Sequence, residues 1–357
     1  MKWLRYVRSP RLNWIQVEVS SHCNSSCIYC PNTVYRDRWL NRHMELKTFR
    51  NLLPAFVKTG LVFLQGWGEP LLNPDFFTMV SLAKEAGRRV GTTTNGMCLD
   101  EEKLSELMES GIDIVAFSLA GTDENNDTIR KGTSFERIMS AIRTLARMKA
   151  ERNTARPAIH IAYLLLRSGM DDVGRLPSLA QDLGVNQIVI STLDFVPSSK
   201  LVDETIVHAT SSEYDELRSR LDALAESGER LGVPIHYYLA SPERHEQGIE
   251  QGKAPLADRF GLSDGGGLAC TENIRRALFI SADGSISPCV FTNLPVSEPV
   301  IASQSVERSY QRVVFGNVNE QSLESVWQRK DYTAFRRSFV PGRIPGVCQG
   351  CPKIYRM

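Results

Sequence analysis

The feature that most constrains the fold of this chain is a regular alternation of strand-like and helix-like segments between residues 15 and 191. Short runs of apolar or alternating residues predict strands, and each run is followed by a helical pattern or a loop. Repeated strand–helix units of this kind form parallel sheets with right-handed crossovers. The predicted strands are residues 15–20, 61–65, 89–94, 112–118, 159–166 and 187–191.

Local signals mark the ends of several intervening helices. Asn73 is the expected N-cap of a helix that stops at Gly87, where a glycine suits the position after the last turn. Thr133 and Glu136 have the spacing of a capping box for a helix that runs to about Lys149. The six units are fewer than the eight of a closed barrel. The chain is therefore expected to be an α/β protein with an open, partial (β/α)6 parallel barrel.

The pattern changes after residue 191. A charged amphipathic helix is predicted over residues 211–231, and a seventh strand over 233–239. Residues 242–267 are polar and glycine-rich and read as a connector. Asp283-Gly284 then lies between two short apolar runs, which is a strong hairpin signal. A last amphipathic helix is expected over about residues 322–339.

These patterns divide the chain into three parts. Residues 1–200 are expected to form the partial barrel, residues 201–267 a connector, and residues 268–357 a small C-terminal domain of hairpin and helix. Only about 14 residues precede the first strand, so we expect no separate N-terminal peptide-binding domain.

Composition and charge exclude some classes of partner. Hydrophobic residues make up 42% and charged residues 23%, which is ordinary for a soluble globular protein. The net charge is only +1, so we expect neither a nucleic-acid nor a membrane partner. No apolar run is long enough to span a bilayer and the N-terminus lacks a signal-peptide core, so we expect a cytoplasmic protein.

Seven of the eight cysteines fall into groups, which in a reducing compartment indicates metal binding or catalysis. Cys23, Cys27 and Cys30 follow the first predicted strand, at the edge where parallel sheets place active sites. Three thiolates can bind three irons of a 4Fe–4S cluster and leave the fourth iron open. A zinc site that borrows a fourth ligand remains an alternative on spacing alone.

This CxxxCxxC loop after the first strand resembles the signature of the radical S-adenosylmethionine (SAM) superfamily. Tyr29, directly before the third cysteine, matches the aromatic residue that this family usually has there. The resemblance implies that SAM chelates the open iron, that an electron cleaves SAM to a 5′-deoxyadenosyl radical, and that this radical abstracts hydrogen from a substrate. Reduced flavodoxin or ferredoxin is the electron donor implied.

Further residues at successive strand ends match the SAM-contacting motifs of the same family. Gly66, Trp67, Gly68 and Glu69 resemble its Gly-Gly-Glu motif, although Trp67 replaces a small residue. The resemblance also assigns SAM contacts to a threonine, an asparagine, a serine and an arginine, and an adenine contact to a leucine. These residues are Thr94, Asn95, Ser118, Arg130 and Leu165.

A second group of thiols lies near the C-terminus. Cys270, Cys289, Cys348 and Cys351 could hold either a zinc ion or a 4Fe–4S cluster. The surrounding sequence resembles the SPASM/twitch domain of radical SAM enzymes, with enough cysteines for one auxiliary 4Fe–4S cluster. The resemblance therefore implies two clusters in all, the second of which relays electrons.

The implied activity is a net oxidation or other modification of a peptide or protein side chain. The alternatives are a dehydrogenase or epimerase acting on a small molecule, such as a sugar or a cofactor precursor, and a non-catalytic zinc- or iron–sulfur-binding protein. The remaining cysteine, Cys98, is a candidate hydrogen-atom donor, with a packed small side chain as the plainer interpretation.

Overall fold

The computed structural model describes residues 12–206, 210–239, 268–296, 300–303, 306–340, 343–349 and 351–356. The predicted connector over residues 242–267 lies outside this part of the chain. None of the helices described is long and apolar enough to cross a membrane.

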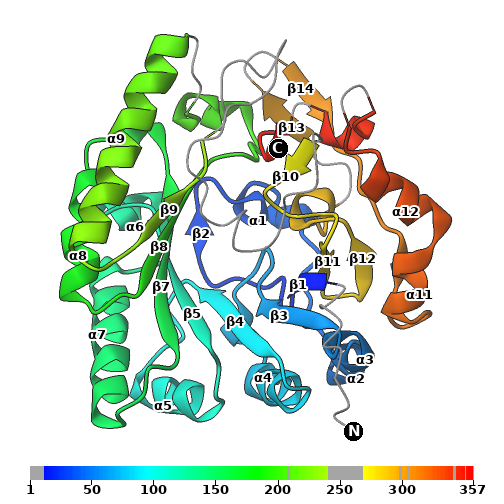
Figure 1. Cartoon of the computed structure of the whole chain (residues 1–357), viewed down its shortest axis with the longest axis horizontal. Coiled ribbons are helices and arrows are strands. Elements are labelled where there is room, and N and C mark those ends of the chain that lie inside the picture. The colour runs from blue at the N-terminus through cyan, green and yellow to red at the C-terminus, as the bar shows by residue number, and fades with distance from the viewer. Residues whose placement is uncertain are drawn as a thin grey trace, which may run out of the picture.

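One curved sheet organises the molecule, with the strand order β15-β12-β11-β1-β3-β4-β5-β7-β8-β9. From β11 to β9 every neighbouring pair is parallel, as the strand–helix alternation predicts. Figure 1 shows the larger helices on the outer side of this curved sheet and the loop that carries β2 and α1 on its inner side. The expected α/β partial barrel is confirmed.

The strands of the main sheet that come from the first part of the chain are β1 (Leu12–Val17), β3 (Thr59–Leu64), β4 (Arg89–Thr94), β5 (Ile114–Leu119), β7 (Ala158–Leu165), β8 (Gln187–Thr192) and β9 (Ile235–Tyr237). Those from the C-terminal part are β11 (Ala277–Ile280), β12 (Ser285–Ser287) and β15 (Gly316–Asn317). Smaller pairs join β2 (Ser26–Cys27) to β6 (Arg130–Lys131), β10 (Leu268–Cys270) to β16 (Ile354–Arg356), and β13 (Val300–Ser303) to β14 (Val306–Ser309).

The α-helices of the barrel and its surroundings are α1 (Pro31–Val34), α2 (Leu46–Arg50), α3 (Leu53–Phe56), α4 (Phe76–Glu85), α5 (Glu101–Glu109), α6 (Asn125–Ile129), α7 (Phe135–Glu151), α8 (Leu176–Asp182) and α9 (Ser211–Arg230). The C-terminal part adds α11 (Leu323–Gln328) and α12 (Lys330–Arg337). The last amphipathic pattern therefore forms two helices, because Arg329 adopts an extended conformation between them.

Two of the predicted helix starts are wrong. The N-cap of α4 is Asp75. The side-chain oxygen of Asn73 accepts from the Asp75 N–H at 2.8 Å in the turn before the helix, while its amide donates to Val19 O at 2.6 Å and to Met44 O at 3.1 Å. The N-cap of α7 is Ser134 rather than Thr133, whose hydroxyl donates to Arg130 O. The Asn73 amide is bound by two segments distant in sequence, whereas the Thr133 hydroxyl bonds within its own turn. The predicted stop at Gly87 is confirmed by its left-handed φ of 74°.

The C-terminal hairpin is part of the barrel sheet. β11 and β12 pair around Asp283-Gly284, as predicted, and β11 also lies parallel to β1 with Val17 beside Ile280. Leu278, Ile280 and Ile286 are buried in the same apolar core as the barrel strands. The hairpin thus covers the β1 edge and continues the hydrophobic core into the C-terminal part.

Candidate active site

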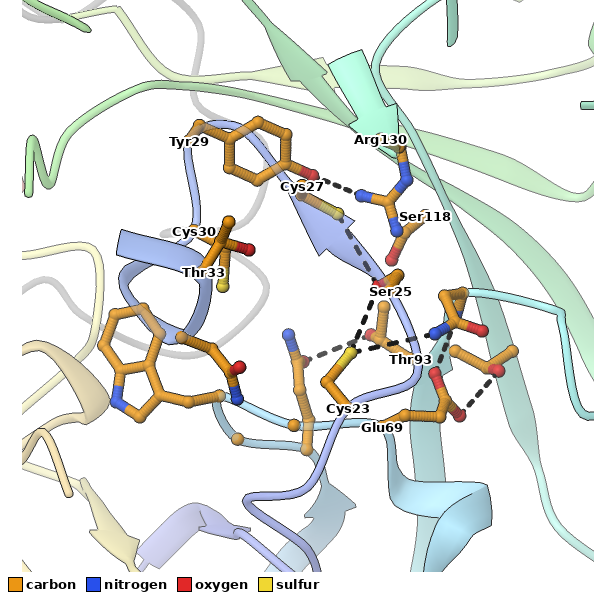
Figure 2. A pocket seen from close by; sticks show the side chains of 17 residues that line it. Cys23, Ser25, Cys27, Tyr29, Cys30, Thr33, Glu69, Thr93, Ser118 and Arg130 are labelled. Carbon is orange, nitrogen blue, oxygen red and sulfur yellow. Dashed lines mark hydrogen bonds between the residues drawn. The ribbon is translucent and has the colours of Figure 1, made fainter. Parts of the chain in front are cut away.

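A pocket lies at the carboxyl ends of β1, β3, β4 and β5, and the three N-terminal cysteines line it. Figure 2 shows Cys23, Cys27 and Cys30 on the loop that wraps one side of this pocket. The loop is fixed by β2, whose Cys27 pairs with Arg130 of β6, and by α1, which begins directly after Cys30. The structure therefore brings the three thiols to one place.

Ser25 lies between two of these sulfurs. Its hydroxyl is 3.1 Å from the sulfur of Cys23 and 3.7 Å from that of Cys27. Burial is the main cause that raises the pKa of the Cys30 thiol, to about 12, and the neighbouring Cys27 raises it further. Burial likewise raises the pKa of Cys23. Iron is bound by thiolates and not by thiols. Burial disfavours the negative charge of a thiolate, and bound iron would compensate that charge.

The loop of residues 65–69 after β3 forms the opposite wall. A Cβ at Gly68 would lie 2.4 Å from His22 O and 2.5 Å from Ser20 O, so only glycine allows this close approach. Trp67, the departure from the family motif, packs its ring against the rings of Phe195 and Phe291.

Glu69 connects this loop to the next strand end. Its carboxylate accepts hydrogen bonds from the Thr94 hydroxyl at 2.8 Å and from the Asn95 backbone N–H at 2.7 Å. Burial raises the pKa of the Glu69 carboxyl, although these hydrogen bonds oppose the rise. The side chain of Asn95 reaches Asn24 in the cysteine loop at 2.7 Å. Glu69 therefore links its own loop to the loop after β4 directly, and to the cysteine loop through Asn95.

Arg130 supplies positive charge on the remaining side. Its guanidinium donates to the Tyr29 hydroxyl, as Figure 2 shows, and it is 6% exposed. Burial alone would lower the pKa of Arg130, but Tyr29 and the cysteines around it raise it, so the guanidinium stays charged. Its Nε is buried and has no hydrogen-bond partner among the described residues. A buried, charged guanidinium with a free N–H suits an anionic ligand. Its planar pair of donors fits the two oxygens of a carboxylate.

Most of the residues assigned by motif line this pocket, but two do not. Leu165 is fully buried in the main core and is not among the lining residues. Cys98 lies just outside, where its sulfur accepts from the Asn24 amide at 3.5 Å. The motifs also missed five lining residues, of which Ser25 had a signal in its position between two cysteines. They are Ser25, Asn32, Thr33, Gln65 and Thr93.

The four C-terminal thiols form a second group. Cys270 and Cys348 are buried in a small apolar cluster, and Cys289 and Cys351 pack against it. Burial is the main cause that raises the pKa of Cys270, and the nearby sulfurs of Cys289 and Cys351 add to it. Lys353, two residues beyond Cys351, forms a 2.9 Å ion pair with Asp194 at the end of β8. This ion pair joins the segment that carries the C-terminal cysteines to the barrel.

Both sites fit the groups that the sequence implies, on the chemistry of their donors. All eight cysteines are free thiols, and seven of them gather at two places. In the described part of the chain no three His, Cys, Asp or Glu side chains are placed to hold a single metal ion. Soft thiols suit an iron–sulfur cluster, and the unpaired Nε of Arg130 suits the carboxylate of SAM.

The fold and the two thiol groups define an α/β enzyme of the iron–sulfur class, with its pocket at the carboxyl ends of parallel strands. Comparison with protein families makes this specific. Residues 17–166 match the radical SAM superfamily, and residues 270–352 match an iron–sulfur cluster-binding domain, named SPASM. The chain therefore belongs to the radical SAM superfamily and carries a SPASM domain. Its cofactors are SAM, the SAM-binding 4Fe–4S cluster of this family and additional iron–sulfur cluster content in the C-terminal domain.

Two curated relatives match nearly the whole chain. The tungsten-containing aldehyde ferredoxin oxidoreductase cofactor-modifying protein of Pyrococcus furiosus is 24% identical, over 91% of this chain and 83% of that protein. The AdoMet-dependent heme synthase of Methanosarcina barkeri is also 24% identical, over 96% of this chain and 88% of that protein. The solved structure of Streptococcus suis SuiB bound to SAM shares the fold, with a TM-score of 0.64, 13% identity and coverage of 95% and 70%.

Proposed function

We propose that this enzyme binds its SAM-cleaving 4Fe–4S cluster through Cys23, Cys27 and Cys30 and holds SAM in the pocket that they line. The observation that carries the proposal is the convergence, in one pocket, of three free thiols and a buried arginine with an unpaired Nε. When bound, the cluster supplies the electron that cleaves SAM to a 5′-deoxyadenosyl radical. The chain's own residues position SAM: Arg130 faces its carboxylate, and the close-packed loop of residues 66–68 provides its backbone contacts.

Cys270, Cys289, Cys348 and Cys351 are the proposed ligands of an auxiliary 4Fe–4S cluster. The four sulfurs leave no ligand position for substrate on such a cluster, so electron transfer is the role that fits. The ion pair of Lys353 with Asp194 supports this role, because it fastens the four C-terminal cysteines to the loop that follows β8. We therefore propose a net oxidation, in which the substrate gives a hydrogen atom to the radical, an electron to this centre and a proton to water.

The substrate that we favour is a small cofactor precursor. The relatives that match along almost the whole chain are named for cofactor modification and heme synthesis. Trp67, which lines the pocket, belongs to a packed aromatic cluster with the buried Phe195 and the partly buried Phe291 and Tyr310, so the wall beside the pocket is apolar. A peptide side chain is the second candidate, because the same fold occurs in SuiB, which has been solved with a precursor peptide.

The assignment of the two thiol groups is tested by anaerobic reconstitution, reduction with dithionite and addition of SAM. The wild type should release 5′-deoxyadenosine, and a variant with Cys23, Cys27 and Cys30 replaced by alanine should release none. Continued SAM cleavage by this triple variant would show that the site is assigned wrongly. Cys270→Ala with Cys289→Ala should keep partial SAM cleavage and lose product formation; full turnover would remove the auxiliary centre from the mechanism.

The substrate class is tested by deuterium transfer into 5′-deoxyadenosine. Two panels are compared, one of tetrapyrroles deuterated on their side chains and one of deuterated peptides. Transfer from a tetrapyrrole supports the cofactor-precursor proposal, whereas transfer only from a peptide replaces it with the second candidate. Substituting reduced flavodoxin or ferredoxin for dithionite tests the donor that we propose; no 5′-deoxyadenosine with either protein would contradict it.

A further inference from the structure

A buried carboxylate outside the pocket connects the SAM-binding loop to the C-terminal domain. Glu18 follows β1 and is 1% exposed. Its Oε1 accepts a hydrogen bond from the Trp67 backbone N–H at 2.8 Å, and its Oε2 accepts one from the Ala282 backbone N–H at 3.2 Å. Trp67 belongs to the loop after β3, and Ala282 to the turn between β11 and β12. One carboxylate therefore bridges two segments that are far apart in sequence.

A second hydrogen bond runs between the same two parts of the molecule. The indole N–H of Trp67 donates to Asn293 O at 3.1 Å. The side-chain amide of Asn293 is itself fixed, because it donates to the hydroxyls of Ser281 at 3.1 Å and Ser287 at 2.9 Å. Trp67 is therefore bound to the C-terminal domain through its side chain and, by way of Glu18, through its backbone.

The neighbouring residue packs directly on this carboxylate. A Cβ at Gly66 would lie 2.3 Å from Cγ and 2.6 Å from Oε1 of Glu18, so the backbone of the loop rests against the Glu18 side chain. A shift of Glu18 would therefore move Gly66 and Trp67 together. Both residues line the pocket, whereas Glu18 does not.

We propose that Glu18 is a positioning residue for SAM: its ionised carboxylate fixes the loop of residues 66–68 at the place set by the C-terminal hairpin. The proposal rests on the function proposed above, in which this loop contacts SAM. It makes SAM binding in the barrel dependent on a turn of the C-terminal domain. Asn293 lies four residues after Cys289, so the same domain that carries the second thiol group also supports the SAM loop.

The charges around Glu18 give the proposal a pH signature. Burial is the main cause that raises the pKa of Glu18, to about 7; the Trp67 and Ala282 amides and Arg312 lower it, and Asp283 raises it. Above that pH the carboxylate accepts both hydrogen bonds. Below it, the protonated carboxyl is neutral, so both N–H groups lose their charged partner, and one of them faces a hydroxyl in place of an acceptor oxygen. The loop should therefore be held less firmly as the pH falls through about 7.

Glu18→Gln tests this, because the amide has the same shape but offers only one acceptor for the two N–H groups. SAM affinity is measured by anaerobic equilibrium dialysis on the reconstituted holoenzyme, at about one pH unit above and below the pKa of Glu18. At the higher pH the variant should bind SAM about tenfold more weakly than the wild type, the effect of one lost charge-assisted hydrogen bond. At the lower pH the difference should shrink, because the wild type has lost the same interaction.

Asp113→Asn is the matched control. Asp113 is also a buried carboxylate, 8% exposed, that accepts from a backbone N–H, but it lies at the opposite end of the strands. This variant should bind SAM as the wild type does. Equal SAM affinity of Glu18→Gln and wild type at both pH values would overturn the proposal, and so would an affinity loss that does not depend on pH.

A second variant keeps the test decisive if Glu18→Gln does not fold. Trp67→Phe removes the hydrogen bond to Asn293 O and leaves the buried carboxylate in place. It should weaken SAM binding while the iron content stays at the wild-type level; unchanged affinity would contradict the proposal. A wild type that loads iron and does not bind SAM would instead refute the proposed function, so the two failures are distinguishable.

Discussion

Arg130 lies where two walls of the pocket meet, because its backbone pairs with Cys27 while its guanidinium contacts Tyr29. Its position depends on a short antiparallel pair that joins β2 to β6, two segments about a hundred residues apart. Single side chains of this kind determine what the pocket can bind. The same holds for Gly68, where the missing side chain leaves room for the backbone oxygens of Ser20 and His22.

Replacing Arg130 by lysine should weaken SAM binding about tenfold, because a lysine cannot offer the planar pair of donors that a carboxylate accepts. Equilibrium dialysis on the reconstituted protein measures this. Lys131→Met is the control, since Lys131 is the exposed neighbour in β6 and carries the same charge outside the pocket. Wild-type affinity in Arg130→Lys would mean that only the positive charge matters and not the planar pair of donors.

Gly68→Ala should prevent normal assembly of the site. The added Cβ would meet backbone atoms of Ser20, Ser21 and His22 within 2.6 Å, and backbone cannot give way as a flexible side chain can. Because His22 directly precedes Cys23, we expect lower iron content and loss of SAM cleavage. Gly174→Ala, at a glycine with open space around it, should leave both unchanged. Normal iron loading in Gly68→Ala would show that the loop tolerates the shift.

Among the elements, α4, β4 and β5 are joined by polar contacts at the end of the sheet away from the pocket. Asp113, just before β5, accepts from the Val90 N–H at 2.8 Å and pairs with Lys84 of α4 at 2.6 Å. Arg156 also approaches it at 3.3 Å, but this side chain is 70% exposed and adds little. These contacts join α4, β4 and β5 into one unit.

Asp113→Asn should lower the free energy of unfolding by about 1–3 kcal/mol at neutral pH, because it removes a buried, paired carboxylate. Burial alone would raise the pKa of Asp113, but Lys84, the Val90 N–H and Arg156 hold it below its ordinary value. Its stabilisation is therefore present above the unfolded-state pKa and is lost as the pH falls through the lower folded-state pKa.

Chemical denaturation of the wild type and this variant across a pH series measures the effect. The difference in the free energy of unfolding between wild type and variant should be constant from about pH 5 to 8 and shrink below about pH 4. A difference that grows in acid would contradict this sign.

At the scale of the whole molecule, the C-terminal part completes the barrel sheet. β11 takes the place beside β1, and Ile280 is fully buried in the core that the barrel strands share. Two of the interactions that fix the loop of residues 66–68, those of Glu18 and Trp67, also cross between the two parts. The barrel and the C-terminal hairpin are therefore expected to unfold together.

Ile280→Ala tests this cooperativity. The substitution should cost about 2–5 kcal/mol, as for other large-to-small changes in a packed core, and it should lower the midpoint of one common transition. Circular dichroism follows the barrel, and visible absorbance follows the iron centres. Val314→Ala, at a side chain that is 42% exposed, should change little. An early transition confined to the C-terminal thiols would show that the two parts unfold separately.

Much of the barrel and much of the pocket lining could be predicted from the sequence. The strand runs are correct to within a few residues, and the helix end predicted at Gly87 is correct because the backbone conformation of one glycine decides it. Asn73 was misjudged because its amide reaches Val19 and Met44, which local spacing does not reveal. Leu165 failed to reach the pocket for a related reason: in a strand, alternate side chains face opposite sides, and Leu165 faces the core.

The strand–helix alternation, the spacing of the cysteine loop and the hairpin at Asp283-Gly284 are legible in the sequence, because each depends on residues within one turn, strand or loop. The extension of the sheet by β11 at β1, and the contacts of Glu18 with Trp67 and Ala282, appear only in the folded chain. Those contacts join positions up to 264 residues apart. Such contacts depend on the path of the entire chain, which decides which buried N–H groups lack a partner in their own segment. No periodic pattern in the sequence records this.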